Sequence, residues 1–284
     1  MQVRKSRPGD WLAIETLHRR AHRKLPQLWW WAEHLADDPF IVIERDGVIA
    51  GALFAWPDDS PVAWVRLAVL DDNLNADQWL DLALPPILDS LRRRGTHNLG
   101  WMDYGRWARP HLQARGFRKL TDVITLSKLD RTLPGTNGTN AYTRPTSDAD
   151  IPAVVAVDRA AFPPHWWYSE FTLVRRTSES SHFAVAEQAG GQVIGYAEGD
   201  LRLPVAHINR IAVHPAHQGH GVGALLLRDA LRTFWRLGAK QISLNTQTDN
   251  HYSQRLYRRF GFKPTGNSVT AWELELEPIP KTTP

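Results

Sequence analysis

A glycine-rich turn at residues 218–223, Gln-Gly-His-Gly-Val-Gly, has the composition of a site for an anionic group. Glycine has no Cβ, so the backbone can turn tightly and approach a ligand closely. The turn follows a strand-like apolar run at residues 208–213 and precedes a helix-like run at residues 224–237. The first N–H groups of a helix have no partner within it and carry the positive end of its dipole. Strand, turn and helix together predict a phosphate cradle.

Two other phosphate-binding motifs do not fit this turn. No Lys-Ser or Lys-Thr pair follows the glycines, which excludes a Walker A loop. Gly219, Gly221 and Gly223 do not match Gly-x-Gly-x-x-Gly, and no N-terminal strand of a doubly wound sheet precedes them. On spacing alone, a tight loop without a ligand is an equally good interpretation.

The residues around the turn make the signal specific. Residues 210–223 resemble motif A of the GNAT (Gcn5-related N-acetyltransferase) superfamily, Gln/Arg-x-x-Gly-x-Gly/Ala, with Gln218, Gly221 and Gly223 at its fixed positions. Residues 250–262 resemble the second signature of the family, which runs from an Asn through a Tyr to Gly-Phe. The resemblance covers roughly residues 141–277.

The resemblance implies acetyl-CoA as the cofactor, with CoA as a product. The turn would hold the pyrophosphate, and a backbone amide of the preceding strand would polarise the thioester carbonyl. Asn250 and Ser253 are candidates for further CoA contacts; the alternative is plain helix capping by Asn250 and a solvated Ser253. The residues expected to bind the cofactor are Ile211, Ala212, Val213, Gln218, Gly219, His220, Gly221, Val222, Gly223, Asn250 and Ser253.

Tyr257 is the candidate general acid, because it stands where the family keeps its acidic tyrosine. A phenol with a pKa near ~10 is protonated at neutral pH and can donate to a departing thiolate. The alternative is a tyrosine packed on the sheet with its hydroxyl on a backbone carbonyl.

The general base is less well defined by the sequence. The position that holds a glutamate in the histone acetyltransferase branch of the family is His207 here. Histidine has a suitable pKa, near ~6.5. Glu198 and Asp200, on the preceding strand, are rivals that could act through water. All three stay open at this point.

A Phe-Pro-Pro-His-Trp-Trp-Tyr segment at residues 162–168 resembles the Phe-Pro…Trp segment of ribosomal-protein N-terminal alanine acetyltransferases. Trp166 and Trp167 are therefore candidates for binding the acceptor, while a hydrophobic loop packed over the core is an equally good interpretation. His214, His217 and His220 flank the turn, but their spacing does not define a closed metal site. No metal is predicted.

An internal repeat divides the chain into two halves, as offsets of 140 to 145 residues connect similar segments. Arg-Leu-Ala-Val at 66–69 corresponds to Arg-Ile-Ala-Val at 210–213, and Gly116-Phe117 to Gly261-Phe262. Alternating strands and helices predict an α/β fold with a mixed, covered sheet. With the resemblance, the prediction is two tandem GNAT-like domains, each a mostly antiparallel twisted sheet flanked by helices.

The two halves differ at the turn. The first half lacks the glycines there and carries Asp71, Asp72 and Asp77, whose charges would repel a pyrophosphate. We therefore predict a degenerate GNAT-like domain without a cofactor loop at residues 1–132, a linker at 133–140 and an active acetyltransferase domain at 141–284.

Composition narrows the possible partners. The chain has 284 residues, no cysteine and a formal net charge of +4. The absence of cysteine excludes disulfides, thiolate metal sites and a cysteine nucleophile. The charge is too small and too dispersed to indicate nucleic acid. No apolar run of roughly 18 residues predicts a membrane helix, and the first residues lack a signal-peptide core, so a cytoplasmic location is expected.

The resemblance implies an acetyl-CoA-dependent N-acetyltransferase in which a primary amine attacks the thioester directly. The acceptor would be a small-molecule amine or a peptide N-terminus, with no nucleic acid or membrane partner; the sequence does not define the oligomeric state. One alternative is a non-catalytic acyl-CoA-binding sensor or scaffold. Another is a tandem transferase similar to mycothiol synthase, which acetylates an amino-sugar conjugate.

Overall fold

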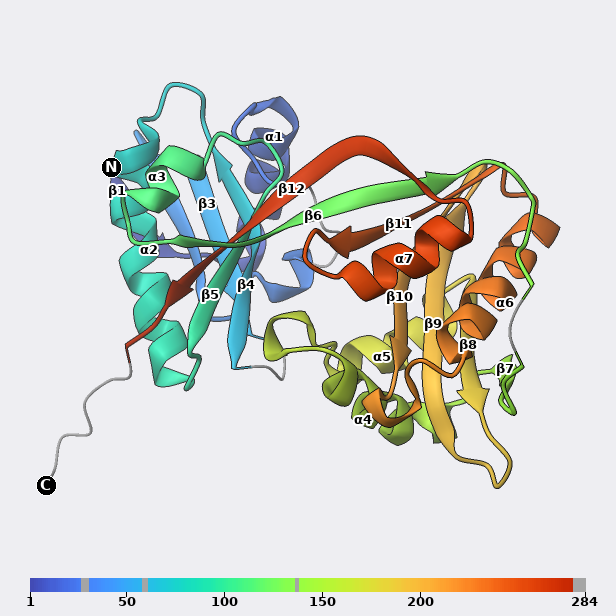
Figure 1. Cartoon of the computed structure of the whole chain (residues 1–284). Coiled ribbons are helices and arrows are strands. Elements are labelled where there is room, and N and C mark those ends of the chain that lie inside the picture. The colour runs from blue at the N-terminus through green and yellow to red at the C-terminus, as the bar shows by residue number, and fades with distance from the viewer. Residues whose placement is uncertain (27–30, 58–60, 136–137, 278–284) are drawn as a thin grey trace, which may run out of the picture. The chain divides into compact units, whose positions relative to one another are not determined.

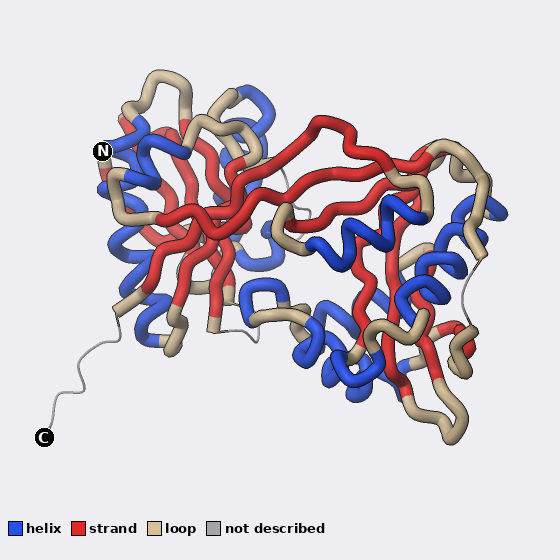
Figure 2. Tube along the Cα trace, viewed as in Figure 1, coloured by secondary structure: helices blue, strands red, loops and turns tan. Residues whose placement is uncertain are grey.

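A computed structural model describes residues 1–26, 31–57, 61–135 and 138–277. Residues 136–137 of the expected linker and 278–284 of the expected second domain lie outside this description. Within the described residues, no helix combines the length and the apolar character needed to cross a membrane. Figure 1 labels the helices and strands, and Figure 2 colours them by type.

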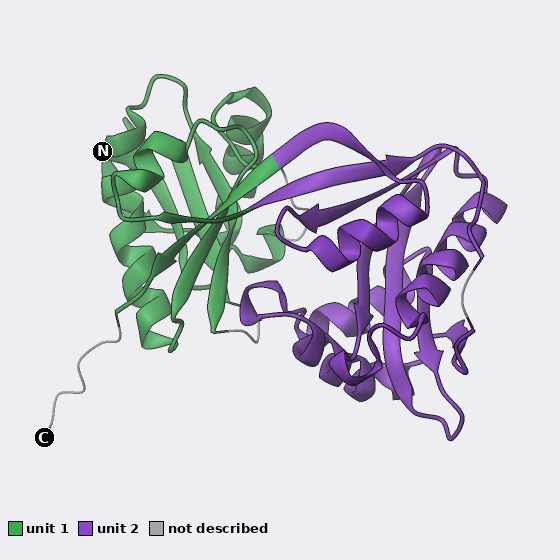
Figure 3. Cartoon of the chain, in the orientation of Figure 1, with its two compact units in different colours: residues 1–121, 269–284 green, residues 122–268 purple. Residues whose placement is uncertain are grey.

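The chain forms two compact units (Figure 3), Met1–Thr121 with Val269–Pro284, and Asp122–Ser268. The strands of the first half are β1 (Gln2–Lys5), β2 (Phe40–Arg45), β3 (Val48–Trp56), β4 (Val62–Leu70), β5 (Asn98–Asp103) and β6 (Arg118–Lys128). Its α-helices are α1 (Trp11–Arg20), α2 (Ala76–Arg93) and α3 (Arg109–Gln113).

The second half repeats this order of strands and helices and adds one helix, α5, before β8. Its strands are β7 (Tyr142–Pro145), β8 (His182–Glu187), β9 (Val193–Arg202), β10 (Val205–Val213), β11 (Gln241–Gln247) and β12 (Lys263–Glu275). Its α-helices are α4 (Ile151–Ala161), α5 (Glu170–Glu179), α6 (Val222–Arg236) and α7 (His251–Arg259). Short 3-10 helices include η4 (Pro164–Trp166) and η5 (Pro215–His217).

The strand pairing confirms the predicted mixed α/β fold. Strand order is β1-β2-β3-β4-β5-β12 in the first unit and β6-β11-β10-β9-β8-β7 in the second. Neighbouring strands within each unit run antiparallel, except that β4 is parallel to β5 and β10 is parallel to β11. A parallel pair needs a crossover connection, and α2 and α6 supply it.

The unit boundaries differ from the predicted domains 1–132, 133–140 and 141–284. Strand β6 comes from the first half, yet its residues Val123–Lys128 pair with β11 of the second unit. Strand β12 comes from the second half, and its residues Thr270–Glu275 pair with β5 of the first unit. Each unit is therefore completed by a strand that the sequence assigns to the other half.

Helices cover both faces of the sheet in each unit (Figure 1). In the second unit, α4 and α5 bury Val154 and Leu173 against Tyr196. On the opposite face, α6 buries Leu227 and Phe234 against β10 and β11, where α7 adds its own apolar side chains. In the first unit α1 and α2 take the corresponding positions.

An ion-pair motif confirms that the halves repeat each other. Arg144 donates to both oxygens of Asp150 at 2.8 Å and to Glu187 at 2.6 Å. Arg4 makes the same contacts with Asp10 and Glu44 in the first half. Each aspartate ends a 3-10 turn that leads directly into α1 or α4.

Candidate active site

The open edge of β10 is the centre of the site. Strand β10 pairs with β9 up to Val213, but it pairs with β11 only from Val205 to Ile208. The N–H of His214 donates to Ile194 at 2.9 Å. Because backbone groups alternate along a strand, Ala212 also faces β9, whereas Ile211 and Val213 face the open edge.

The glycine-rich turn lies where β10 ends. The amide nitrogen Nε2 of Gln218 donates to the carbonyl of Val213 at 3.0 Å, which ties the turn to the open edge. Gly219 and Gly221 have φ angles of 81° and 83°. Only glycine adopts this left-handed conformation without strain, so the backbone itself requires these two residues. Gln218, Gly219 and His220 are exposed.

The first turn of α6 offers free backbone donors. Gly221 is the N-cap, and no side chain among the described residues caps it. The first hydrogen bond inside the helix joins Leu225 N–H to Gly221 at 3.0 Å, so the three preceding N–H groups have no helical partner. A Cβ at Gly223 would lie 3.4 Å from Leu256, which is ordinary contact, so packing within the chain does not require this glycine. The cradle fits a phosphate group.

Tyr257 lies on α7 with its side chain packed beside Phe262, at 6.0 Å between ring centroids. Burial raises its pKa to about 12, against a hydrogen bond with Ser253 that lowers it. The phenol therefore keeps its proton at neutral pH. The side chain of Asn250 accepts a hydrogen bond from the N–H of Ser253 at 3.1 Å. Asn250 therefore caps helix α7, which was the alternative to a CoA contact.

His207 is held as a neutral imidazole with a defined tautomer. Its Nδ1 lies 2.8 Å from the hydroxyl of Ser243, and that hydroxyl donates to the carbonyl of Ala206 at 3.1 Å. Since the hydroxyl has one proton, Nδ1 of His207 must donate to it, which leaves the lone pair on Nε2. Burial lowers the pKa of His207, partly offset by Asp200. This arrangement suits a base.

Glu198 is fully buried, and one of its carboxylate oxygens accepts several hydrogen bonds. Its Oε2 accepts hydrogen bonds from Arg176, Ser180 and Asn209, whereas its Oε1 has no partner among the described residues. Asp200 shares Arg176 and Asn209, at 2.7 and 2.9 Å. Asp200 is the register partner of His207 in β9, whereas Glu198 lies opposite Arg210.

The candidate acid and bases lie on opposite faces of the sheet. Tyr257 belongs to the same apolar cluster as Ala206 and Ile208, under α6 and α7. His207 lies between those two residues in β10, so its side chain points to the face of α4 and α5. The side chains of Arg176, Asn209 and Arg210 also lie on this face of the sheet. The sequence interpretation did not assign helix α5, which carries Arg176.

The tryptophans predicted to bind the acceptor lie in a loop that the chain itself fixes. The indole nitrogen of Trp167 donates to the carbonyl of Phe162 at 2.8 Å, and its ring lies 5.8 Å from the guanidinium of Arg159. The carbonyl of Trp166 accepts from Arg210 at 2.6 Å. Both tryptophans are half-buried.

The histidines at the turn have other surroundings. The rings of His214 and His217 lie 5.9 Å apart, and His214 accepts the N–H of Ala216. His217, His220 and Val222 help to line a pocket of about 360 Å³ beside the turn. Across the described ranges, no group of three ligating side chains is placed to hold a metal ion.

The equivalent edge in the first unit is filled by the chain itself. Strand β4 pairs with β5 only from Val62 to Trp64, so its later residues correspond to the open edge of β10. There Leu25 N–H donates to Ala68 at 2.8 Å, Leu70 N–H donates to Arg23 at 3.2 Å, and Lys24 forms an antiparallel bridge with Val69.

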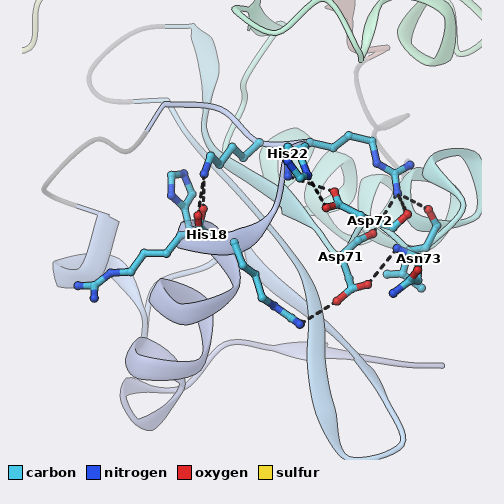
Figure 4. A network of polar contacts seen from close by, with 10 residues as sticks. His18, His22, Asp71, Asp72 and Asn73 are labelled. Carbon is cyan, nitrogen blue, oxygen red and sulfur yellow. Dashed lines mark hydrogen bonds and ion pairs between the residues drawn. The ribbon is translucent and has the colours of Figure 1, made fainter.

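Side chains hold this segment in place (Figure 4). Arg20 donates to Asp71 at 2.7 Å, and both the backbone and the ring of His22 contact Asp72. The guanidinium of Arg23 donates to the carbonyls of three residues of the loop after β4, at 2.7 to 3.0 Å. Asn75 caps α2 with its side chain. The helix N-terminus that corresponds to α6 is thus already satisfied.

Comparison with known proteins identifies the family. Residues 151–262 match the acetyltransferase (GNAT) family. The N-alpha-acetyltransferase RimI of Mycobacterium tuberculosis is 35% identical over 123 residues, which are 42% of this chain and 72% of the relative. The chain belongs to the GNAT family of acetyltransferases. The match covers α4 to the end of α7, and hence the turn, the open edge and Tyr257 of this GNAT protein.

Two further proteins are similar to this GNAT chain. A Bacillus subtilis protein assigned as a ribosomal protein bS18-alanine N-acetyltransferase is 29% identical over 128 residues, which are 45% of this chain and 84% of the relative. The solved structure of a tandem GNAT protein from the clavulanic acid biosynthesis pathway superposes with a TM-score of 0.65 at 17% identity, covering 96% of this chain and 95% of the other. The latter likeness extends the tandem GNAT fold to both halves.

Proposed function

We propose that this chain is an acetyl-CoA-dependent N-acetyltransferase with one active site, in the second unit, that transfers the acetyl group directly to a primary amine. The contrast between the two units carries the proposal. In the second unit the edge at Ile211 and Val213 is open and ends at a glycine turn. In the first unit the corresponding edge is occupied by residues 23–25.

Acetyl-CoA would supply the activated acetyl group as a thioester. The free N–H groups at the start of α6 would bind its pyrophosphate, because they combine unpaired donors with the positive end of the helix dipole. The N–H groups of Ile211 and Val213 face the open edge and could donate to the thioester carbonyl, which gains negative charge during attack. Ala212 would contribute side-chain packing only, since its backbone faces β9.

The positions of the acid and the base suit attack across the sheet. His207, with its lone pair on Nε2, would accept a proton from an amine that arrives on the α5 face. Tyr257 would donate its proton to the thiolate on the α7 face. Glu198 and Asp200 would attract the ammonium form of the acceptor, because together they outnumber the one guanidinium they share, that of Arg176.

The acceptor class proposed is the α-amine of a peptide N-terminus. Two relatives are named for activity on such amines, one on the alanine of ribosomal protein bS18. The aromatic loop at 162–168 would contact the first side chains of the peptide. A small-molecule amine, including the amino-sugar conjugate expected of a mycothiol synthase-like enzyme, is the competing acceptor. A cytoplasmic location stays a prediction.

Calorimetric titration of the full-length protein with acetyl-CoA, followed by turnover assays, tests the proposal. One site per chain, with transfer to a peptide that begins with alanine, is the expected result. Two sites would contradict the single-site assignment, and binding without turnover on peptides or amines would favour the sensor alternative. Faster turnover of an amino-sugar conjugate than of any peptide would replace the acceptor class.

A further inference from the structure

We propose that Arg210 is a positioning residue that couples the cofactor edge of β10 to the aromatic loop at residues 162–168, and thereby sets the affinity for the acceptor. This inference rests on the proposed function, because it gives the two sides of that site a physical connection. Arg210 precedes Ile211, the first residue whose backbone faces the open edge.

A β-bulge directs Arg210 toward the loop. The register of β10 on β9 shifts between Ile208 and Arg210. Asn209 is the extra residue, and a bulge of this kind places two consecutive side chains on one face. Asn209 accordingly donates to Glu198 and Asp200, at 3.1 and 2.9 Å. Arg210 points to the same face of the sheet, where the loop lies.

The guanidinium of Arg210 is enclosed by the loop. It lies 3.7 Å from the ring centroid of Tyr168 and 4.3 Å from that of Phe162, so it is held between two aromatic rings. Its Nη2 donates to the carbonyl of Trp166 at 2.6 Å. Three contacts from residues 162–168 thus converge on one side chain that is 9% exposed.

Asp158 balances the buried charge of Arg210. This fully buried carboxylate lies 3.4 Å from Nη1 of Arg210 and also accepts the backbone N–H of Tyr168 at 2.9 Å. The hydroxyl of Tyr196 bonds its other oxygen. The loop is therefore attached to α4 through Asp158 and to β10 through Arg210.

This arrangement predicts reciprocal coupling. When a thioester carbonyl binds the backbone beside Arg210, it restrains the strand that carries the guanidinium, and the loop is ordered with it. Coupling between two ligands must be mutual, so acetyl-CoA should tighten acceptor binding and the acceptor should tighten acetyl-CoA binding. Arginine suits this role better than lysine, because its flat guanidinium stacks on rings and donates in a fixed geometry.

The experiment compares Arg210→Lys with Arg159→Lys in the full-length protein. Both variants make the same chemical change at a residue that stacks on this loop, but Arg159 is exposed on α4 and stacks on the Trp167 ring from outside. Arg210→Lys should raise the acceptor KM at least tenfold with kcat changed less than threefold. The dissociation constant of acetyl-CoA alone should stay within threefold, and Arg159→Lys should leave all three values near wild type.

Hydrogen exchange supplies a readout that does not need turnover. In the wild type, acetyl-CoA should slow exchange at residues 162–168, and in Arg210→Lys the loop should exchange faster and respond little to acetyl-CoA. Unchanged loop exchange together with an unchanged acceptor KM would overturn the proposal. If the wild type binds no acetyl-CoA, the proposed function fails, while faster loop exchange in the free variant still supports the positioning role.

A second variant covers the case in which Arg210→Lys does not fold. Phe162→Leu removes one of the two stacked rings and leaves the Arg210–Asp158 pair intact. It should also speed exchange at residues 163–168 and raise the acceptor KM. A folded Phe162→Leu protein with wild-type exchange and KM would contradict the proposal.

Discussion

Arg176 donates two hydrogen bonds to a single oxygen of Glu198, from Nε at 2.9 Å and from Nη2 at 2.5 Å. The carboxylate is fully buried, so its charge depends on this partner, because an unpaired buried charge is strongly unfavourable. The other oxygen of this carboxylate, Oε1, is buried and has no hydrogen-bond partner among the described residues. His207, by contrast, presents Nε2 with only a weak contact from Asn245 at 3.4 Å.

Replacement of the two candidate bases should separate their roles. His207→Asn keeps a donor near Nδ1 but removes Nε2, so kcat should fall about 10²- to 10⁴-fold, the usual contribution of general base catalysis. Glu198→Gln keeps the shape and should reduce kcat by about tenfold, through the altered charge beside the acceptor. The pH profile of kcat/KM decides: loss of the acidic limb in Glu198→Gln but not in His207→Asn would make Glu198 the base.

The loss of kcat/KM at acidic pH should begin at a lower pH than for an ordinary histidine base. Burial lowers the pKa of His207 from its ordinary value of 6.5, so the neutral imidazole persists to lower pH than usual. Activity should therefore fall only as the pH drops below 6.5 toward this lowered pKa. Folding stability should decrease in the same direction, because the unfolded chain takes up the proton first. A midpoint for kcat/KM above 6.5 would contradict this assignment.

Tyr257→Phe tests the acid. Removing the phenol should lower kcat about 10²- to 10⁴-fold while the affinity for acetyl-CoA changes little, since the proton is needed only during transfer. Because the pKa of Tyr257 is raised to about 12, the wild type should show no alkaline loss from this group below about pH 11. Equal losses in kcat and in acetyl-CoA affinity would assign Tyr257 to binding instead.

Gly223→Asp tests the phosphate cradle without straining the backbone. Gly221 has a φ of 83°, so a side chain there would strain the backbone. Gly223 has no such positive φ angle, and a Cβ there would make ordinary contacts. A carboxylate there should weaken acetyl-CoA at least 100-fold in calorimetry, because it would lie against the phosphates. Gly223→Ala is the matched control for added volume, with a smaller expected loss. Wild-type affinity in Gly223→Asp would place the cofactor elsewhere.

Amide exchange should distinguish the two corresponding edges. Leu25 and Leu70 donate to backbone carbonyls in the free protein, so their exchange should be slow with and without acetyl-CoA. Ile211 and Val213 face the open edge, and their exchange should slow only when acetyl-CoA is added. Protection of Leu70 that changes with acetyl-CoA would mean that the segment at 23–25 is displaced and that the first unit binds the cofactor.

Local patterns in the sequence predicted the elements of the fold well. The predicted order of strand, glycine-rich turn and helix is confirmed, because β10 ends at Val213 and α6 begins at Val222. The predicted internal repeat is supported by the matching ion pairs of Arg4 and Arg144. These features depend on neighbouring residues, which the sequence displays directly.

The features that the sequence did not predict depend on partners far along the chain. The β-bulge that directs Asn209 and Arg210 to one face leaves no mark in the apolar pattern, so neither residue was assigned to the site. The strand partners of β6 and β12 were also missed, since both halves offer similar edges and nothing local selects between them. Likewise, the negative charge at Asp71 and Asp72 predicted a degenerate loop. It did not predict that residues 23–25 would pair with the neighbouring edge of β4.

Strands β6 and β12 each pair with strands of the other half of the sequence, and this has a consequence for synthesis on the ribosome. The first unit includes residues that follow Val269, and its strand β5 pairs with Thr270–Glu275. When the ribosome has translated the whole first half, that unit still lacks one strand of its sheet, and it must wait for nearly all of the second half. A chain that stops before Thr270 would therefore leave the first unit without the strand that pairs with β5.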